Sequence, residues 1–244
     1  MNDPASPSPA WALREGFNTG LYRVLAWLSP GFPIGSFSFS HGLETAVESG
    51  AVGDRTSLQA WIGAVIARGS GRIDADILRD AHRAASTDDV AALAAANRRG
   101  AAFRATDETR LETTAQGEAF LATCRAAWPD PFLDRWAASL EQGNETVCYA
   151  AAVGVATARA GISLPCALTG YLQAMAANLV SAGLRLGMIG QTDGQRILAA
   201  LEPVIGAAVA GAMTRDADSF GAATFAVELA SMAHETQYSR LFRS

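Results

Sequence analysis

Residues 58–78 read LQAWIGAVIARGSGRIDADIL, and this stretch decides the fold class. Its large apolar residues recur at intervals of three and four, over 58–66 and again over 73–78, which is the spacing of one helical face. The same spacing returns along most of the 244 residues and ends with Phe225, Leu229 and Met232, whereas strand patterns are nearly absent. Alanine, the best helix former, makes up about a fifth of the chain. The sequence therefore predicts an all-α protein.

Helix start and stop residues divide the chain into about ten helices joined by short links. Thr87, Asp88 and Asp89 offer an N-cap with acids in the first turn, and Pro129 and Pro131 end one helix and begin the next. No Gly/Ser/Pro-rich linker separates two domains. We therefore expect a single-domain helical bundle over 17–236, a flexible Pro/Ser-rich tail without signal-peptide character over 1–16, and a partner-docking tail over 237–244.

The composition excludes several classes of protein. Half of the residues are apolar and 18% are charged, which rules out disorder over most of the length. All basic side chains are arginine, so a P-loop lysine, a Schiff base and pyridoxal-phosphate chemistry are excluded. The net charge of −5 and the scattered arginines argue against nucleic-acid binding. Three widely spaced cysteines, Cys124, Cys148 and Cys166, favour a reducing, cytoplasmic compartment.

Two features concern contacts between helices. Residues 160–184 carry no charge and are long enough to span a bilayer, but polar and small residues interrupt them, so we expect a buried helix of the bundle and no membrane partner. Small residues share a helical face at Ala150 and Gly154, and again at Gly206 and Ala210. Packing within the chain is the simpler explanation, although a dimer seam would look the same.

Motifs for catalysis are mostly missing. The three histidines lie far apart, and the zinc-protease, dinucleotide and nucleophile-elbow motifs are absent, so we expect no enzyme. A Ser/His/Asp site built from distant residues stays open. His41, Glu44 and Glu48 would share one helical face and suggest weak divalent-metal binding or a metal-dependent enzyme. Alternatively, His41 helps to satisfy the helix start and the two glutamates form a solvated face.

Two aromatic segments are the least ordinary parts of the chain. Residues 28–40, LSPGFPIGSFSFS, cannot form a regular helix and must bury their rings in their own domain or in a partner. The C-terminal residues 234–244, HETQYSRLFRS, end on apolar and arginine side chains where a terminus usually becomes polar. This tail either docks on its own domain or becomes ordered on a partner.

Residues 27–44, WLSPGFPIGSFSFSHGLE, and 231–244, SMAHETQYSRLFRS, together resemble the UreF family of urease accessory proteins. The resemblance implies an all-α, dimeric, non-enzymatic protein without a cofactor. It also implies that the chain forms a platform with UreD, also called UreH, on apo-urease and recruits and regulates the GTPase UreG. Nickel insertion into urease would follow, with nickel passing through the assembled complex. A helical interaction module unrelated to urease is the remaining alternative.

The resemblance also suggests which residues contact partners. The family's C-terminal segment is implicated in complex formation, and an aromatic position of the first motif, often tyrosine in relatives, is Phe37 or Phe39 here, without a hydroxyl group. The expected partner-binding residues are Phe32, Phe37, Phe39, His41 and Glu44 in the first segment and Tyr238, Arg240, Leu241, Phe242 and Arg243 in the second.

Overall fold

The computed structural model describes residues 18–243, and within them it contains eleven α-helices, two short 3₁₀ helices and no strand. The α-helices are α1 (Thr19–Trp27), α2 (Leu43–Glu48), α3 (Arg55–Arg68), α4 (Ser70–Ser86), α5 (Val90–Ala102), α6 (Asp107–Ala127), α7 (Pro131–Gly143), α8 (Tyr149–Arg159), α9 (Leu164–Arg185), α10 (Gln191–Thr214) and α11 (Phe225–His234). The 3₁₀ helices are η2 (Ser36–Ser38) and η3 (Ala217–Ser219). The all-α prediction is confirmed. The expected N-terminal tail over 1–16 lies outside the described residues.

Local sequence explains several helix starts. The side chains of Asp54 and Thr106 each accept from the backbone N–H three residues later, which closes capping boxes at α3 and α6. Asp89, the last residue of the predicted cap at 87–89, caps α5, so the helix starts after both acids, and Asp130 caps α7 ahead of a proline at its first position. These short caps allow tight links between helices, so the described chain folds without a long linker.

The core lies where α4 and α8 cross. A Cβ atom at Gly154 would lie 2.6 Å from the carbonyl oxygen of Leu78, so this glycine allows the two backbones to touch. Ala150 is also buried, so the first small-residue face packs within the chain. The uncharged stretch predicted to be a buried helix forms most of α9, which contributes Leu168, Leu172 and Leu179 to the core.

α10 is different, because much of its surface is exposed. It is long and apolar enough to cross a membrane by length and composition, with a mean hydropathy of 1.7, and 28% of that window is buried. Gly206 and Ala210 lie on its exposed side, so the second small-residue face is not covered by the described part of the chain. Length and composition do not distinguish a membrane helix from one covered by another protein.

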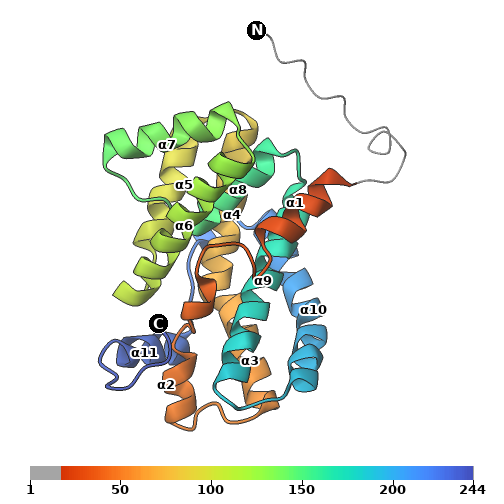
Figure 1. Cartoon of the computed structure of the whole chain (residues 1–244), viewed down its shortest axis with the longest axis vertical. Coiled ribbons are helices and arrows are strands. Elements are labelled where there is room, and N and C mark those ends of the chain that lie inside the picture. Colours follow the sequence, from red (N-terminus) through yellow and green to blue (C-terminus); the bar gives the residue numbers. More distant parts are fainter. Residues whose placement is uncertain (1–17, 244) are drawn as a thin grey trace.

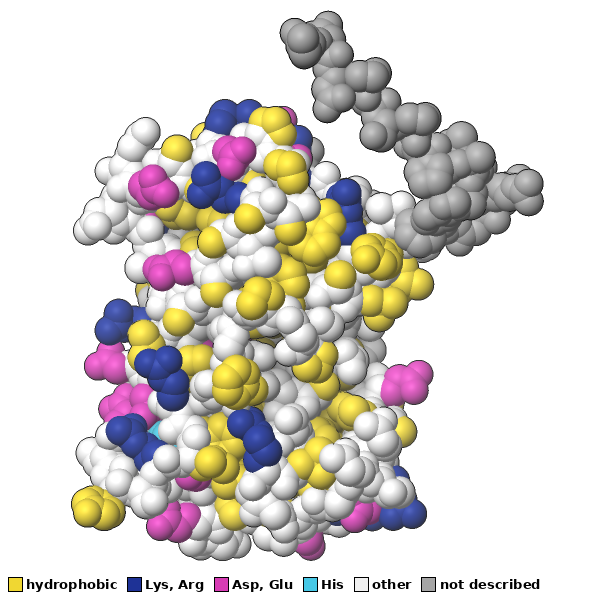
Figure 2. Space-filling view, in the orientation of Figure 1, with side chains coloured by type: hydrophobic (Ala, Val, Ile, Leu, Met, Phe, Trp, Pro, Cys, Tyr) yellow, Lys and Arg dark blue, Asp and Glu magenta, His cyan; other side chains and the backbone are white. Residues whose placement is uncertain are grey.

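The two aromatic segments meet at one end of the molecule. Figure 1 shows α7 at one end and α2, α11 and the C-terminus together at the other. On the face shown in Figure 2, arginine and acidic side chains are intermixed and form no single basic patch. This end, where residues near 40 meet residues near 240, contains the candidate site.

Candidate functional site

The C-terminal segment folds back onto α2. The carboxylate of Glu44 accepts hydrogen bonds from the backbone N–H groups of Leu241, at 2.6 Å, and Phe242, at 2.9 Å. The N–H of Arg243 donates to the carbonyl oxygen of Ser38 at 2.7 Å, which joins the tail to η2. Of the two alternatives for the tail, the structure shows docking on its own domain.

Glycine 42 makes this arrangement possible. Its φ of +72° is a left-handed conformation, and a Cβ atom there would lie 2.6 Å from the backbone nitrogen of Ser231 in α11. α11 can therefore approach the start of α2 directly. Gln237, which follows α11, accepts a hydrogen bond from Thr45 of α2 at 2.6 Å and fixes the beginning of the tail.

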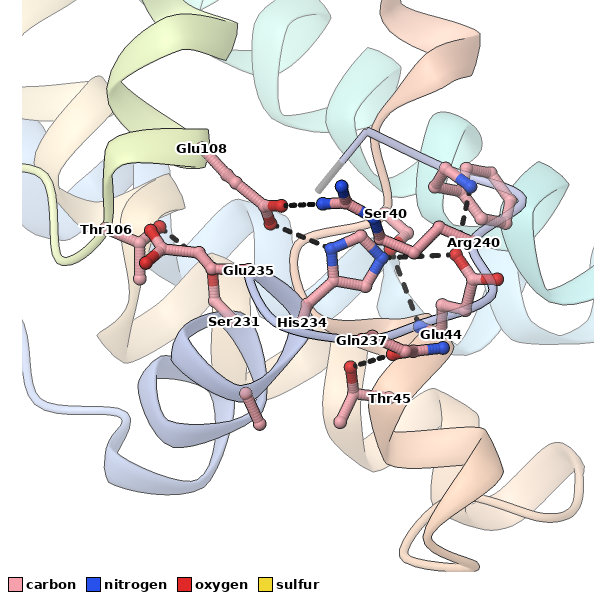
Figure 3. A network of polar contacts seen from close by, with 12 residues as sticks. Ser40, Glu44, Thr45, Thr106, Glu108, Ser231, His234, Glu235, Gln237 and Arg240 are labelled. Carbon is pink, nitrogen blue, oxygen red and sulfur yellow. Dashed lines mark hydrogen bonds and ion pairs between the residues drawn. The ribbon is translucent and has the colours of Figure 1, made fainter.

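His234 lies at the centre of a buried network of charged groups, shown in Figure 3. Its Nδ1 atom is 2.8 Å from Glu108 of α6, and its Nε2 atom is 3.2 Å from Glu44. Arg240 of the tail pairs with the other oxygen of Glu108 at 2.8 Å. The network thus connects α2, α6, α11 and the tail.

The tail has a buried side and an exposed side. Phe242 is 3% exposed and lies under the guanidinium of Arg185, whose carbon is 4.3 Å from the ring centroid. Tyr238 and Leu241 point to solvent, and Arg240 is half exposed. The docked tail therefore leaves one tyrosine and one leucine exposed to solvent.

The rings of the first segment also divide into two groups. Phe32 is buried against Phe120 and Trp128, with centroid distances of 5.2 and 6.3 Å, and Phe39 is buried as well. Phe37 sits on η2, and 65% of its surface is exposed. The segment is thus largely a core element that presents one ring to solvent.

His41 and Glu44 do not form a shared site. His41 precedes α2 with a φ of +54°, and its Nε2 atom lies 3.1 Å from Glu112, whereas Glu44 turns toward His234. Glu48, one turn after Glu44 at the end of α2, is exposed. Both earlier interpretations were therefore wrong for Glu44, because it is neither a metal ligand beside His41 nor solvated. Among residues 18–243, no group of three or more His, Cys, Asp or Glu side chains is arranged to hold a metal ion.

A hydroxyl, an imidazole and a carboxylate do come together around His41. Ser70 at the start of α4 lies 3.3 Å from Nδ1, on the side of the ring opposite Glu112. Burial alone would lower the pKa of His41, but the charge and hydrogen bond of Glu112 outweigh it and raise the pKa above 6.5. The same contact with Glu112 and the hydrogen bond to Ser70 hold the ring between α6 and α4.

These residues line a pocket of about 270 Å³ that the sequence did not reveal. Its wall includes Asp74, which pairs with Arg104 at 2.6 Å and accepts from the hydroxyl of Tyr171 at 2.8 Å. Burial and the charge of Asp74 raise the pKa of Tyr171. The charged groups of this wall satisfy one another, because His41 pairs with Glu112 and Asp74 with Arg104.

α11 carries an exposed apolar face that sequence reasoning did not assign to a surface. Phe225, Leu229 and Met232 are spaced by four and three residues and are 76%, 63% and 47% exposed. Their helical spacing was correctly recognised, but it did not reveal that this face points away from the core. With Tyr238 and Leu241 of the tail they form what we call the C-terminal surface.

The ten expected partner-binding residues thus fall into two sets. Five are buried in the described structure, namely Phe32, Phe39, His41, Glu44 and Phe242. Five reach solvent, namely Phe37, Tyr238, Arg240, Leu241 and Arg243. The buried set positions the exposed set, most directly where Glu44 holds the backbone of the tail.

Comparison of the sequence with known proteins shows which family the chain belongs to. The family model named UreF matches residues 52–202. A urease accessory protein UreF of Bradyrhizobium sp. strain BTAi1 is 46% identical over 244 residues, which cover 100% of both chains. A protein of the same name from Granulibacter bethesdensis is 47% identical over 227 residues, 93% of this chain and 95% of the relative. The chain belongs to the UreF family of urease accessory proteins.

Proposed function

We propose that this chain is a cytoplasmic, non-catalytic platform for urease maturation. In this proposal it binds UreD/UreH through the C-terminal surface, sits with it on apo-urease, and recruits and regulates the GTPase UreG so that nickel enters the urease active site. Family membership supports a role in urease maturation. Because the chain has no lysine, the phosphate-binding lysine of a P-loop must come from another subunit.

The single observation that carries the proposal is the C-terminal surface. Five large apolar side chains are exposed between Phe225 and Leu241. Fully burying a side chain of this size contributes about 1.5–3 kcal/mol, so a partner that covers several of them gains substantial binding free energy. Tyr238 and Arg240 add residue types that are enriched at interface hot spots.

The docked tail makes this surface available before a partner arrives. Ordering a flexible segment opposes binding by about 1–2 kcal/mol per residue in backbone entropy alone. Here Glu44 and Glu108 already hold the tail through the backbone of 241–242 and the side chain of Arg240. Partner binding therefore avoids much of this entropic penalty.

We further propose that two copies associate through α10. The exposed side of this helix presents Gly206, Ala207 and Ala210, and a Cβ atom at Gly206 would have no neighbour within 4 Å. Small residues allow a second helix to approach closely, and in a symmetric dimer the same face would serve both copies. This face belongs to a different helix from the C-terminal surface, so one chain can use both.

Co-expression with UreD tests the platform. We expect Leu229→Glu combined with Met232→Glu to reduce recovery of UreD with the tagged chain by about tenfold or more, because charges replace two apolar contacts. The matched control is Leu25→Glu, which alters an exposed leucine of α1. Undiminished recovery with the double variant, or equal loss with Leu25→Glu, would remove the C-terminal surface from the proposal.

A further inference from the structure

The side chain of His234 is fully buried with a carboxylate on each side of its ring (Figure 3). Glu108 lies 2.8 Å from Nδ1, and Glu44 lies 3.2 Å from Nε2. Both ring nitrogens are donors only in the charged imidazolium. In the neutral ring, one nitrogen would direct a lone pair at a carboxylate oxygen, so this geometry fits the protonated form.

The charges around the ring balance only when it is protonated. α2 contributes Glu44, α6 contributes Glu108, and the tail contributes Arg240, which pairs with Glu108. Glu235, the next residue of the chain, accepts from a backbone N–H of α6 and lies on the exposed side of the network. With His234 charged, two cations face two buried carboxylates. Loss of its proton leaves one buried negative charge without a cation, which is costly in a buried site.

The second buried histidine of this region, His41, does not replace the positive charge that His234 loses with its proton. Glu112 lies one turn beyond Glu108 on α6, but its carboxylate pairs with His41 and accepts a hydrogen bond from Gln116. The same carboxylate of Glu44 accepts from the backbone N–H groups of Leu241 and Phe242, so an uncompensated charge on Glu44 acts directly on the attachment of the tail.

We propose that His234 is a proton-sensitive latch for the C-terminal tail. The latch is closed while the imidazole is charged, and it opens as rising pH removes the proton. Histidine is the side chain that ordinarily changes charge between about pH 5 and 8, which makes it the group of this network suited to a proton-driven switch. The inference rests on the proposed function in one respect, since opening the latch would displace the two residues that the tail contributes to the C-terminal surface, Tyr238 and Leu241.

The isolated full-length chain tests the latch without any partner. Hydrogen exchange of residues 236–243 is measured from about pH 5.5 to about pH 8.5 and corrected for the intrinsic rate, while NMR follows the His234 ring. We expect protection of Leu241 and Phe242 to fall by up to about tenfold per pH unit above the midpoint, because one proton is released. Protection that stays constant while His234 titrates, or a His234 ring that does not titrate in this range, would overturn the latch.

Variants separate the latch from general stability. In His234→Gln, tail exchange should lose its pH dependence, whereas His82→Gln should keep it, because His82 bonds to the carbonyl of Ile162 at a distant site. If His234→Gln does not fold, Glu108→Gln should shift the midpoint to lower pH, since one carboxylate that stabilises the charged ring is gone. An unchanged midpoint contradicts the proposal. These readouts involve no UreD, so their failure leaves the platform untouched, and failure of the UreD experiment leaves the latch intact.

Discussion

The guanidinium of Arg185, at the end of α9, covers the ring of Phe242, with 4.3 Å between the guanidinium carbon and the ring centroid. This contact attaches the tail to a third helix beside α2 and α6. Arg185 is exposed to solvent, so the cation–π pair itself contributes modestly, whereas Phe242 is nearly fully buried. The ring is therefore the apolar anchor of a segment that is otherwise held by hydrogen bonds and ion pairs.

Replacing Phe242 with alanine should release the tail without unfolding the domain. The lost burial is worth about 1.5–3 kcal/mol, but a terminal segment can detach alone, so the helical core does not share the cost. We expect faster hydrogen exchange at 236–243, unchanged circular dichroism and weaker association with UreD. Phe37→Ala is the control for the exchange measurement, because that ring is exposed. Loss of helical signal in the Phe242 variant would show that the tail supports the core itself.

Gly154→Ala should destabilise the whole fold. The added Cβ atom would lie 2.6 Å from the carbonyl oxygen of Leu78 and 3.1 Å from the nitrogen of His82, and these backbone atoms cannot move cheaply. Overpacking of this kind costs about 1–3 kcal/mol. For a chain of this size, that lowers the melting temperature by about 2–4 °C per kcal/mol.

The matched substitution is Gly63→Ala in α3, where the new Cβ atom would lie 3.7 Å from a side-chain carbon of Leu201, an ordinary van der Waals contact. Alanine is favoured over glycine inside a helix by about 0.5–1 kcal/mol, so this variant should melt slightly higher. Thermal unfolding of both variants, followed by circular dichroism, compares the two sites directly. Equal melting temperatures would contradict the close crossing of α4 and α8.

The helical fold was predictable because apolar spacing reports local geometry. The same spacing cannot report what covers an apolar face, which is why Phe225, Leu229 and Met232 could be assigned to a helix but not to a surface. Which face of α11 points to solvent depends on how α11 packs against α2. That packing depends on Gly42 and on the contact between Glu44 and His234, which are 190 positions apart. The tail could be recognised as unusual from its composition alone.

The charged networks could not be predicted from local sequence. Glu44 near the start of a helix fits a solvated acid that favours the helix dipole, and nothing nearby indicates a buried histidine partner. Its partner His234 is 190 residues away, and Asp74 meets Tyr171 across 97 residues. Pairings between single residues on different helices leave no periodic signal in one sequence, so only the three-dimensional arrangement reveals them.

The pH dependence of stability should have opposite signs at two histidines. Burial lowers the pKa of His41, but the charge and hydrogen bond of Glu112 raise it by a larger amount. The pKa of His41 in the folded protein therefore lies above 6.5. Its contribution to stability is complete below about 6.5 and is lost as pH rises through the folded value. His82 has a lowered pKa because of burial, so its contribution is present above 6.5 and is lost as pH falls.

Urea unfolding at several pH values checks this prediction. The difference in unfolding free energy between the native chain and His41→Gln should be larger at about pH 5.5 than at about pH 8.5. The difference for His82→Gln should be larger at the higher pH. A difference for His41→Gln that grows with pH would mean that the imidazole is neutral in the folded protein and that Glu112 does not hold its proton.

Ala210→Arg should convert a dimeric chain into a monomer. The residue lies on the exposed side of α10, and an arginine there would keep two backbones apart and place like charges beside each other in a symmetric contact. Sedimentation velocity measures the change, and Ala95→Arg on the exposed side of α5 is the control. If the Ala210→Arg variant is still a dimer and binds UreD normally, a face other than α10 joins the two copies. If the native chain is already monomeric and co-sediments with lipid vesicles through α10, the apolar length of that helix serves a membrane instead of a second copy.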